Sequence, residues 1–145
     1  MRRLLLKFEG TNPTGTIKDR SSATAVAAAR QFGYRAISVV STGNAGSSLA
    51  GYATRAALRA FIFCYERASA PKLAHMRLVA SDLVLYRGFY DDLIRLWDRM
   101  IEEEPVFDGG ASRNAYKQEG KKTLAWEIAE DCAYRLPDVV VYPVA

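Results

Sequence analysis

The sequence predicts an α/β fold, with parallel sheets covered by helices. Short apolar runs rich in β-branched residues alternate with longer helical runs along the 145-residue chain. Few residues join one run to the next, as in strand–helix–strand units. A polar, glycine-containing loop follows one strand and opens a helix, which is also typical of such units.

Composition excludes several classes of protein. The chain is 50% hydrophobic and 25% charged, which is typical of one globular domain. No apolar run approaches the roughly 20 residues of a membrane span, so we expect no membrane partner. The net charge is +4, but lysines and arginines are scattered among acids, which argues against a nucleic-acid partner.

The chain begins with an apolar run at residues 4–8, which we interpret as a buried strand. The run is too short for a signal peptide, and Lys7 and Glu9 interrupt it. Cys64 and Cys132 lie in apolar contexts without metal-ligand spacing, so no metal site is predicted. We expect both to be buried free thiols in a reducing cytoplasm.

A polar turn at residues 12–15 separates this strand from an alanine-rich helix. Thr16 stands three residues before Asp19, a spacing that predicts a capping box at the start of the helix. The helix is expected from residue 18 to about residue 31, and Gly33 is expected to end it.

The remaining elements continue the alternation. His75 is interpreted as a partly exposed helix residue rather than an acid or base. In chain order we expect a strand at 36–40, a helix to about 58, a strand at 61–65, a helix from about 70, a strand at 83–86, a helix to 104 with the core stripe Leu93, Leu96, Trp97 and Met100, a helix buried through Trp126, Ile128 and Ala129, and a buried strand at 137–144.

The capping pattern places Lys18 in the first helical turn. The positive end of the helix dipole lies there, and it disfavours a second positive charge, more so if the amine is desolvated. A neutral amine is what Schiff-base chemistry with a carbonyl cofactor requires. A lysine at a helix start is more often a solvated surface residue, so this local pattern alone does not select catalysis.

The loop S-T-G-N-A-G-S-S at residues 41–48 follows the strand at 36–40 and opens the next helix. Free backbone N–H groups and the helix dipole make such a loop suitable for an anion. An ordinary strand-to-helix turn with a good cap is the alternative interpretation.

Residues 9–20, E-G-T-N-P-T-G-T-I-K-D-R, resemble the pyridoxal-phosphate lysine motif of threonine synthases and of fold-type II relatives such as threonine dehydratase and cysteine synthase. The sequence of this motif is most similar to that of threonine synthases, although Ile17 stands where the family usually has phenylalanine. S-T-G-N-A-G-S-S-L-A resembles the asparagine loop of the same family. The resemblance implies a fold-type II enzyme, similar to the tryptophan synthase β chain, with pyridoxal 5′-phosphate as cofactor.

The resemblance also implies roles for individual residues. Lys18 would be the catalytic Schiff-base lysine. Asn44 would bind the 3′-oxygen of the cofactor. The substrate carboxylate would be received by the asparagine loop, through Ser41, Thr42, Asn44 and Ala45.

A third stretch, N-A-Y-K-Q-E-G-K-K-T at residues 114–123, is similar to a threonine-synthase segment, with Ala115 replacing proline. In that family Glu119 and Lys122 would lie near the substrate cleft. The resemblance covers essentially the whole chain but only the N-terminal portion of a family enzyme. The glycine-rich loop that cradles the cofactor phosphate would begin at about Ala145.

By the same resemblance, residues 1–35 would belong to a large cofactor domain and residues 36–104 would form a small mobile domain. Residues 105–145 would return into the large domain, which is incomplete before the glycine loop. We therefore expect weak cofactor binding and an exposed apolar surface on the last strand.

The implied function is a pyridoxal-phosphate-dependent lyase that converts O-phospho-L-homoserine into L-threonine and phosphate. A serine/threonine dehydratase and a non-catalytic fragment are the alternatives. The expected partner is a small-molecule amino-acid substrate. A homo-oligomer and a complementing C-terminal chain are also left open.

Overall fold

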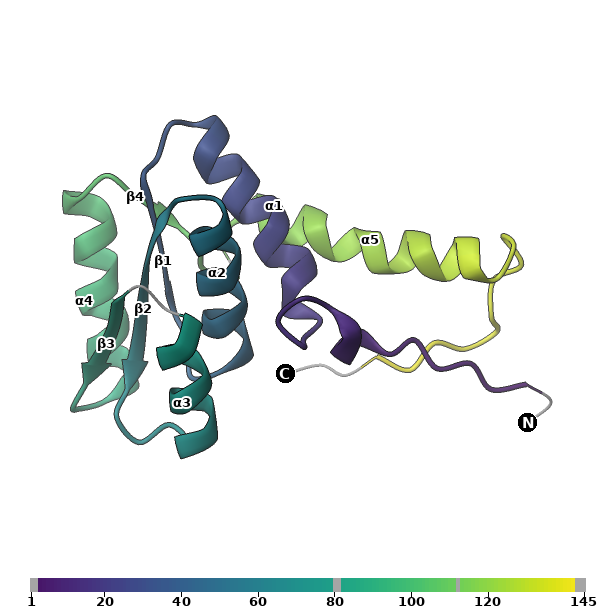
Figure 1. Cartoon of the computed structure of the whole chain (residues 1–145), viewed down its shortest axis with the longest axis horizontal. Helices are drawn as coiled ribbons and strands as arrows, with labels where there is room; N and C mark the ends of the chain where they lie inside the picture. The colour runs from purple at the N-terminus through teal and green to yellow at the C-terminus, as the bar shows by residue number, and fades with distance from the viewer. Residues whose placement is uncertain (1–2, 80–81, 112, 143–145) are drawn as a thin grey trace.

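The computed structural model describes residues 3–79, 82–111 and 113–142. A four-stranded parallel sheet, in the order β3-β2-β1-β4, has helices on both faces (Figure 1), which confirms the predicted α/β fold. The strands are β1 (Ala36–Val40), β2 (Arg59–Tyr65), β3 (Asp82–Tyr86) and β4 (Val106–Asp108). The helices are α1 (Lys18–Gln31), α2 (Asn44–Arg55), α3 (Ala70–Val79), α4 (Tyr90–Glu103) and α5 (Ala115–Asp131), with a short 3-10 helix η1 (Glu9–Thr11).

Helix and strand bounds follow the sequence closely in the first half of the chain. The predicted bounds of α1 and β1 are confirmed. Gly33 follows α1 with a φ of 79°, the left-handed conformation that suits glycine after a helix. α2 ends at Arg55, a little before the predicted end, because Ala57 itself takes a left-handed conformation with a φ of 56°. The three-residue strand β4 was not predicted.

Two apolar clusters fix the layers. On one face of the sheet, α1, α2 and α3 cover a core that includes Ile37, Ile62 and Met76. On the other face α4 packs Leu93 and Trp97 against β2, which confirms the predicted core stripe. The indole N–H of Trp97 reaches through to the Ser38 hydroxyl at 2.9 Å, so the polar atoms of this layer are paired as well.

The connections reverse direction at β1. From β1 the chain moves outward through β2 to β3, and α4 then carries it back across the opposite face to β4 on the other side of β1. Ligands of open α/β sheets bind outside the carboxyl ends of the strands where the order reverses. The loops that follow β1 and β4 occupy this position.

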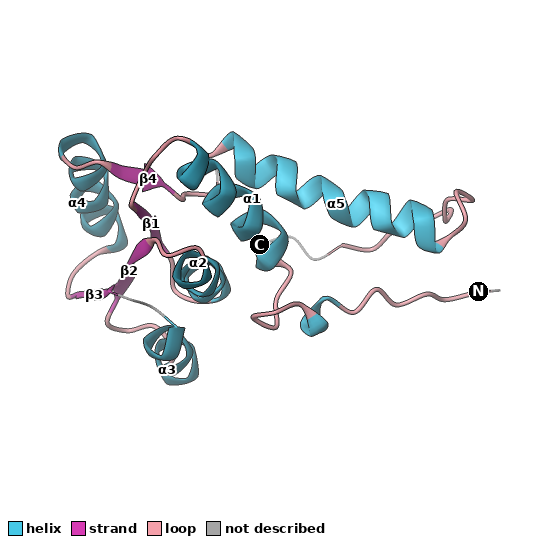
Figure 2. Ribbon diagram, turned by 45° about the horizontal axis from the view of Figure 1, so that its top comes forward, coloured by secondary structure: helices cyan, strands magenta, loops and turns pink. Residues whose placement is uncertain are grey.

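α5 runs outward from the sheet and crosses α1 near its own first turns (Figure 2). Gly120 makes this crossing close, because a Cβ atom here would overlap with the carbonyl oxygen of Arg20 and the hydroxyl of Thr24. The Thr24 hydroxyl also donates a hydrogen bond of 2.7 Å to the carbonyl oxygen of Tyr116. The two helices therefore meet backbone to backbone.

Two predicted strands are wrong. Residues 4–8 lie outside the sheet, and Leu6 is 86% exposed. Residues 137–142 are likewise irregular, and Val141 is 92% exposed, while the rest of the predicted strand lies outside the described residues. The apolar pattern of both segments suits a strand, but among the described residues neither has a neighbouring strand to pair with.

The buried side predicted for α5 is also partly wrong. Trp126 is 66% exposed, since α5 has moved away from the sheet at this point. Ile128 and Ala129 are half-buried. Both cysteines are free, but only Cys64 is fully buried. No helix in the described part of the chain combines the length and the apolar character that crossing a membrane requires.

We predict that Gly120→Ala destabilises the protein by about 2 kcal/mol, because the added methyl group forces the two helix backbones apart. At an open helix position the same change stabilises by about 1 kcal/mol, so the sign of the effect is diagnostic. Urea unfolding measures it, with Lys121→Ala on the exposed side of α5 as the control. A gain in stability would contradict the close crossing.

Candidate functional site

The turn before α1 is closed by its own polar groups. The Gly15 N–H donates to the Asn12 carbonyl oxygen at 2.7 Å, and Gly15 has a φ of 75°, which glycine adopts without strain. The Asn12 side-chain amide donates to Glu9 at 2.9 Å and to the carbonyl oxygen of Thr16 at 3.2 Å. We call residues 12–17 the lysine turn, because this conformation delivers the chain to Lys18.

Lys18 is the first residue of α1 and is half-buried. Within the described residues its amine makes no hydrogen bond or ion pair. The predicted capping box is absent: the hydroxyl of Thr16 accepts from the Lys18 N–H at 3.3 Å, and the Asp19 carboxylate does not return to Thr16. The reason is that Asp19 has stronger partners elsewhere.

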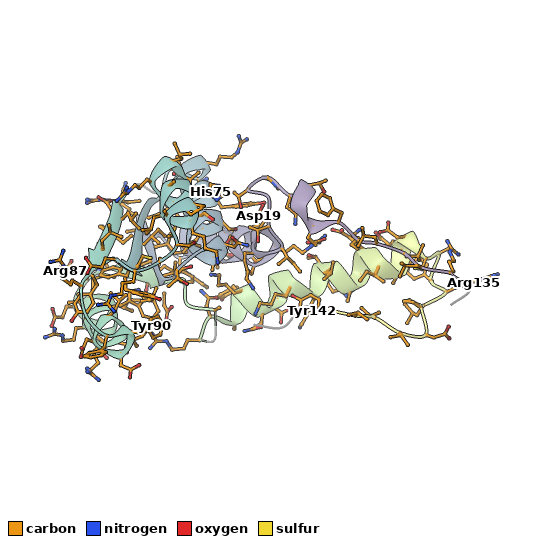
Figure 3. All side chains as sticks on the ribbon, turned by 90° about the horizontal axis from the view of Figure 1, so that it is seen from below. Asp19, His75, Arg87, Tyr90, Arg135 and Tyr142 are labelled. Carbon is orange, nitrogen blue, oxygen red and sulfur yellow. The ribbon has the colours of Figure 1, made fainter. Side chains whose placement is uncertain are left out.

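The Asp19 carboxylate is buried and bonded to two other parts of the chain. It accepts a hydrogen bond from the Thr14 N–H at 2.7 Å and another from the Thr14 hydroxyl. It also accepts from the Ser48 hydroxyl of α2 at 2.6 Å, and Ser48 lies 2.8 Å from the Ser22 hydroxyl. Burial, followed by the charge of Asp19, raises the pKa of Tyr52. Figure 3 labels Asp19 near the junction of the sheet-bearing part and α5.

Arg20 fixes the same segment to α5. Its guanidinium group lies 2.7 Å from Glu9 and 2.6 Å from Glu127, and it donates to the Thr123 hydroxyl at 3.0 Å. Hydrogen bonds from Arg20, and then from Lys7, lower the pKa of Glu127 to about 2. Asp19 and Arg20 thus bond to different helices, and Lys18 stands beside them without a partner in the described chain.

The loop after β1 is closed by a single hydroxyl. The Ser41 hydroxyl accepts from the N–H groups of Gly43 at 3.2 Å and Gly46 at 2.9 Å. In the described chain the N–H groups of Thr42, Asn44 and Ala45 have no acceptor. Gly43, which precedes α2, has no side chain to cap these three groups, so they are available to an anion.

The structure brings the lysine turn and this loop to one helix. Ser48 lies one turn after Asn44 on α2, so both project from the same face. Since Ser48 bonds Asp19, the start of α1 is fixed next to the helix that the loop opens. Thr14 approaches this helix too, because a Cβ atom on Gly51 would lie 2.9 Å from its methyl group.

Other residues singled out in the sequence lie elsewhere. Glu119 and Lys122 are exposed on α5 and form an ion pair of 2.6 Å with each other. His75 is exposed on α3, as expected. Among residues 3–79, 82–111 and 113–142, no three His, Cys, Asp or Glu side chains gather closely enough to hold a metal ion.

One buried charged residue was missed by the sequence analysis. Lys117 of α5 is only 1% exposed, and its amine donates to the Gly109 carbonyl oxygen at 2.7 Å, just after β4. Burial lowers the pKa of the Lys117 amine to about 8, and the charges of Lys121 and Lys18 act in the same direction, while Asp108 opposes them. Asn114 caps the helix by accepting from the Lys117 N–H. No sequence pattern distinguishes this lysine from exposed ones, because its burial depends on where β4 ends.

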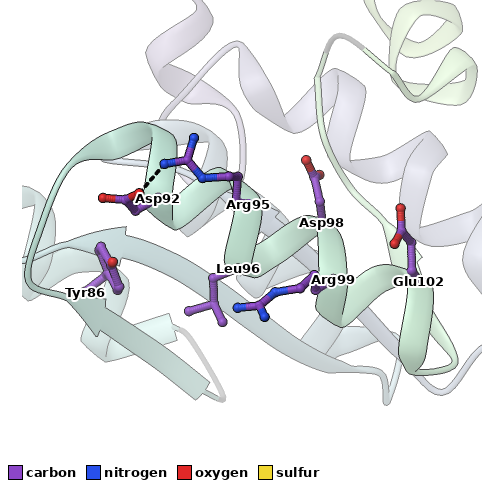
Figure 4. A pocket seen from close by; sticks show the side chains of 7 residues that line it. All are labelled: Tyr86, Asp92, Arg95, Leu96, Asp98, Arg99 and Glu102. Carbon is purple, nitrogen blue, oxygen red and sulfur yellow. Dashed lines mark hydrogen bonds and ion pairs between the residues drawn. The ribbon is translucent and has the colours of Figure 1, made fainter.

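A hollow of about 630 Å³ lies on the other side of the molecule (Figure 4). Its lining comes from α4 and the end of β3, and includes the ion pair between Asp92 and Arg95. α4 covers the face of the sheet opposite to α1 and α2. This hollow is therefore separate from the lysine turn, and we do not assign it to the site.

We predict that Asp19→Ala destabilises the protein by about 3 kcal/mol, because it leaves the buried donors of Thr14 and Ser48 without an acceptor. Asp19→Asn should not restore stability. The asparagine replaces one of the two carboxylate oxygens by an NH₂ group, which would then face a hydrogen-bond donor. Urea unfolding measures both. Asp91→Ala, an exposed acid in the first turn of α4, is the matched control. Equal effects at the two positions would contradict the role of the buried network.

We predict that Lys117 makes stability depend on alkaline pH. Its pKa is about 8 in the folded protein against 10.5 ordinarily, so between these values the unfolded chain binds more protons. The free energy of unfolding should therefore rise with pH in this window, by up to about 3 kcal/mol relative to Lys117→Met. Urea unfolding at intervals from about pH 7 to about pH 10 tests this. A constant difference between the two proteins would refute it, and Lys122→Met supplies the control.

Sequence comparisons identify relatives along nearly the whole chain. Threonine synthase from Bacillus sp. (strain ULM1) is 38% identical over 139 residues, covering 95% of this chain and 39% of that protein. Threonine synthase from Methanocaldococcus jannaschii is 31% identical over 145 residues, covering 99% of this chain and 36% of that protein. The chain thus spans less than half the length of these curated relatives.

Solved structures share the fold. O-ureido-L-serine synthase superposes with a TM-score of 0.76 at 25% identity, over 86% of this chain and 42% of that one. Threonine deaminase isoform 2 from Solanum lycopersicum gives a TM-score of 0.77 at 19% identity, over 86% and 37%. These likenesses confirm the fold-type II architecture. The family model described as pyridoxal-phosphate dependent enzyme matches residues 1–145, so the chain belongs to that family.

Proposed function

We propose that this chain supplies the catalytic lysine and the substrate loop of a threonine synthase-type lyase. The reaction would convert O-phospho-L-homoserine into L-threonine and phosphate. One observation carries the proposal: Lys18 has no partner among the described residues, and the neighbouring Asp19 holds it next to the helix opened by the asparagine loop. Threonine synthases at 31% to 38% identity support this choice of substrate class.

The residues present fit the aldehyde side of pyridoxal phosphate. A half-buried amine without a partner in the described chain suits an aldehyde, and a loop with free N–H groups suits an anionic ligand. Lys18 would hold the cofactor covalently, and the side chain of Asn44, which is exposed, would bind its 3′-oxygen. When bound, pyridoxal phosphate supplies a reactive aldehyde and an electron-withdrawing ring.

The chain's own residues would then act on the substrate. The backbone N–H groups of Thr42, Asn44 and Ala45 would bind its carboxylate, while Ser41 keeps the loop closed around them. The Lys18 amine would take a proton from a substrate carbon and return it to another. Such a shuttle needs an amine without a fixed ion-pair partner, and Lys18 has none among the residues that the structure describes.

The partner that we propose is a polypeptide corresponding to the part of the threonine synthases that this chain does not cover. An apolar groove of about 520 Å³ lies between α5 and the last described segment. Both segments also carry exposed apolar side chains. These side chains include Trp126, Leu136 and Val140. Because the relatives are more than twice as long, a complementing polypeptide from the remaining part of that fold would cover this surface. Self-association through the same face is the alternative outcome.

The division into a large domain at residues 1–35 and 105–145 and a small mobile domain at 36–104 also stays a proposal. Under it, the asparagine loop would move relative to Lys18. The Asp19–Ser48 hydrogen bond of 2.6 Å is the contact on which such a movement would act.

We predict that pyridoxal phosphate followed by borohydride reduction labels Lys18 selectively. The reason is that this amine is half-buried and has no partner in the described chain, whereas Lys72 is exposed and Lys122 is paired with an acid. Mass spectrometry of the digested protein locates the label, and Lys18→Ala should abolish it. Label spread evenly over exposed lysines would mean that the turn does not prepare this amine for the cofactor.

Assays of this protein, with and without the remaining C-terminal part of a related threonine synthase such as that of Bacillus sp. (strain ULM1), distinguish the two activities. Phosphate release from O-phospho-L-homoserine supports the synthase. Formation of a keto acid from L-threonine would support a serine/threonine dehydratase instead. If neither appears when Lys18 is labelled, the chain binds the cofactor without catalysing either reaction.

A further inference from the structure

A lysine from α3 lies over the asparagine loop. A Cβ atom built on Gly43 would lie 2.9 Å from Cδ and 3.2 Å from Nζ of Lys72. The side chain of Lys72 therefore runs across the backbone of Gly43 and brings its ammonium group to the loop. The absence of a side chain at Gly43 thus leaves room for Lys72 to lie across the loop.

α3 is held in this position by a second contact. A Cβ atom on Gly46 would lie 3.0 Å from the sulfur of Met76, which is fully buried. Met76 follows Lys72 by one helical turn, so both project from the same side of α3. The two glycines of the loop thus receive two consecutive side chains of one helix face, and Lys72 is anchored through its own helix.

The charge of Lys72 is not compensated within the described chain. Its amine has no ion-pair or hydrogen-bond partner there, whereas some other basic groups are paired, such as Arg59 with Asp82 and Arg113 with Asp98. Next to it stand the unbonded N–H groups of the loop. A cation without a partner adjoins the groups proposed to bind a carboxylate.

We infer that Lys72 is a specificity-determining residue of the asparagine loop, whose ammonium group adds a positive charge to the binding of an amino acid's α-carboxylate. This inference rests on the proposed function, in which the loop receives that carboxylate. The amine is solvent-exposed, so we expect a contribution of about fivefold in affinity rather than a larger one. Screening by salt should reduce it.

Titration of the ¹⁵N-labelled chain followed by NMR tests the inference without any catalytic reaction. The probes are L-threonine and L-threonine methyl ester, which lacks the carboxylate charge. The amide signals of Thr42, Asn44 and Ala45 should shift with L-threonine and not with the ester. Lys72→Met keeps the aliphatic contact with Gly43 but removes the charge, and should weaken binding about fivefold.

Two further variants isolate the charge. Lys72→Arg should bind within about twofold of the wild type. Arg77→Met, which removes an exposed charge elsewhere on α3, should change nothing. Added sodium chloride should weaken binding to the wild type more than to Lys72→Met.

The outcomes separate this inference from the proposed function. If the loop amides shift and Lys72→Met binds like the wild type, Lys72 is not a specificity residue, while the loop remains a carboxylate site. If L-threonine shifts no loop amide in the wild type, both the inference and the proposed role of the loop fail. Borohydride labelling of Lys18 is an independent measurement and decides the role of the lysine in either case.

Discussion

A buried negative charge must be fully hydrogen-bonded, and the Asp19 carboxylate is the place where this protein meets that requirement. Its donors come from the lysine turn and from α2, so satisfying the charge forces these two segments together. The position of Lys18 follows directly, since it precedes Asp19 in the chain. The candidate site is therefore a consequence of one desolvated carboxylate, and the sheet supplies the frame on which α2 rests.

Three consecutive residues divide the work between structure and chemistry. Asp19 bonds α2, Arg20 bonds Glu9 and α5, and Lys18 keeps its amine free of partners in the described chain. Asp19 is an acceptor facing hydroxyl donors, and Arg20 is a cation facing two carboxylates, so neither residue could exchange places with Lys18. The asparagine loop shows the same division: the Ser41 hydroxyl closes the loop, and the following N–H groups stay available. In both places the residue with an expected chemical role is held by neighbours whose polar groups are fully used.

Local signals predicted local structure well. The helix beginning at Lys18 and the loop before α2 were predicted because turn residues, helix formers and β-branched runs act over a few residues. The strand predictions for residues 4–8 and 137–142 were wrong, because an apolar run forms a strand only when a neighbouring strand supplies backbone hydrogen-bond partners. Lys117 and Lys72 could not be predicted either. Their environments depend on where β4 ends and how α3 packs, which are facts of three-dimensional arrangement rather than of sequence pattern.

The backbone contact at Gly120 gives α5 a mechanical role. Side chains between two helices can change rotamer and absorb a displacement, but the carbonyl oxygen of Arg20 meets the backbone of Gly120 directly. α1 and α5 are therefore in direct backbone contact, and the ion pair between Arg20 and Glu127 connects them a second time further along α5. A polypeptide that displaced the outer part of α5 would therefore also displace the start of α1. Under the proposed function, a partner that covers the outer part of α5 would also fix the position of Lys18 at the start of α1.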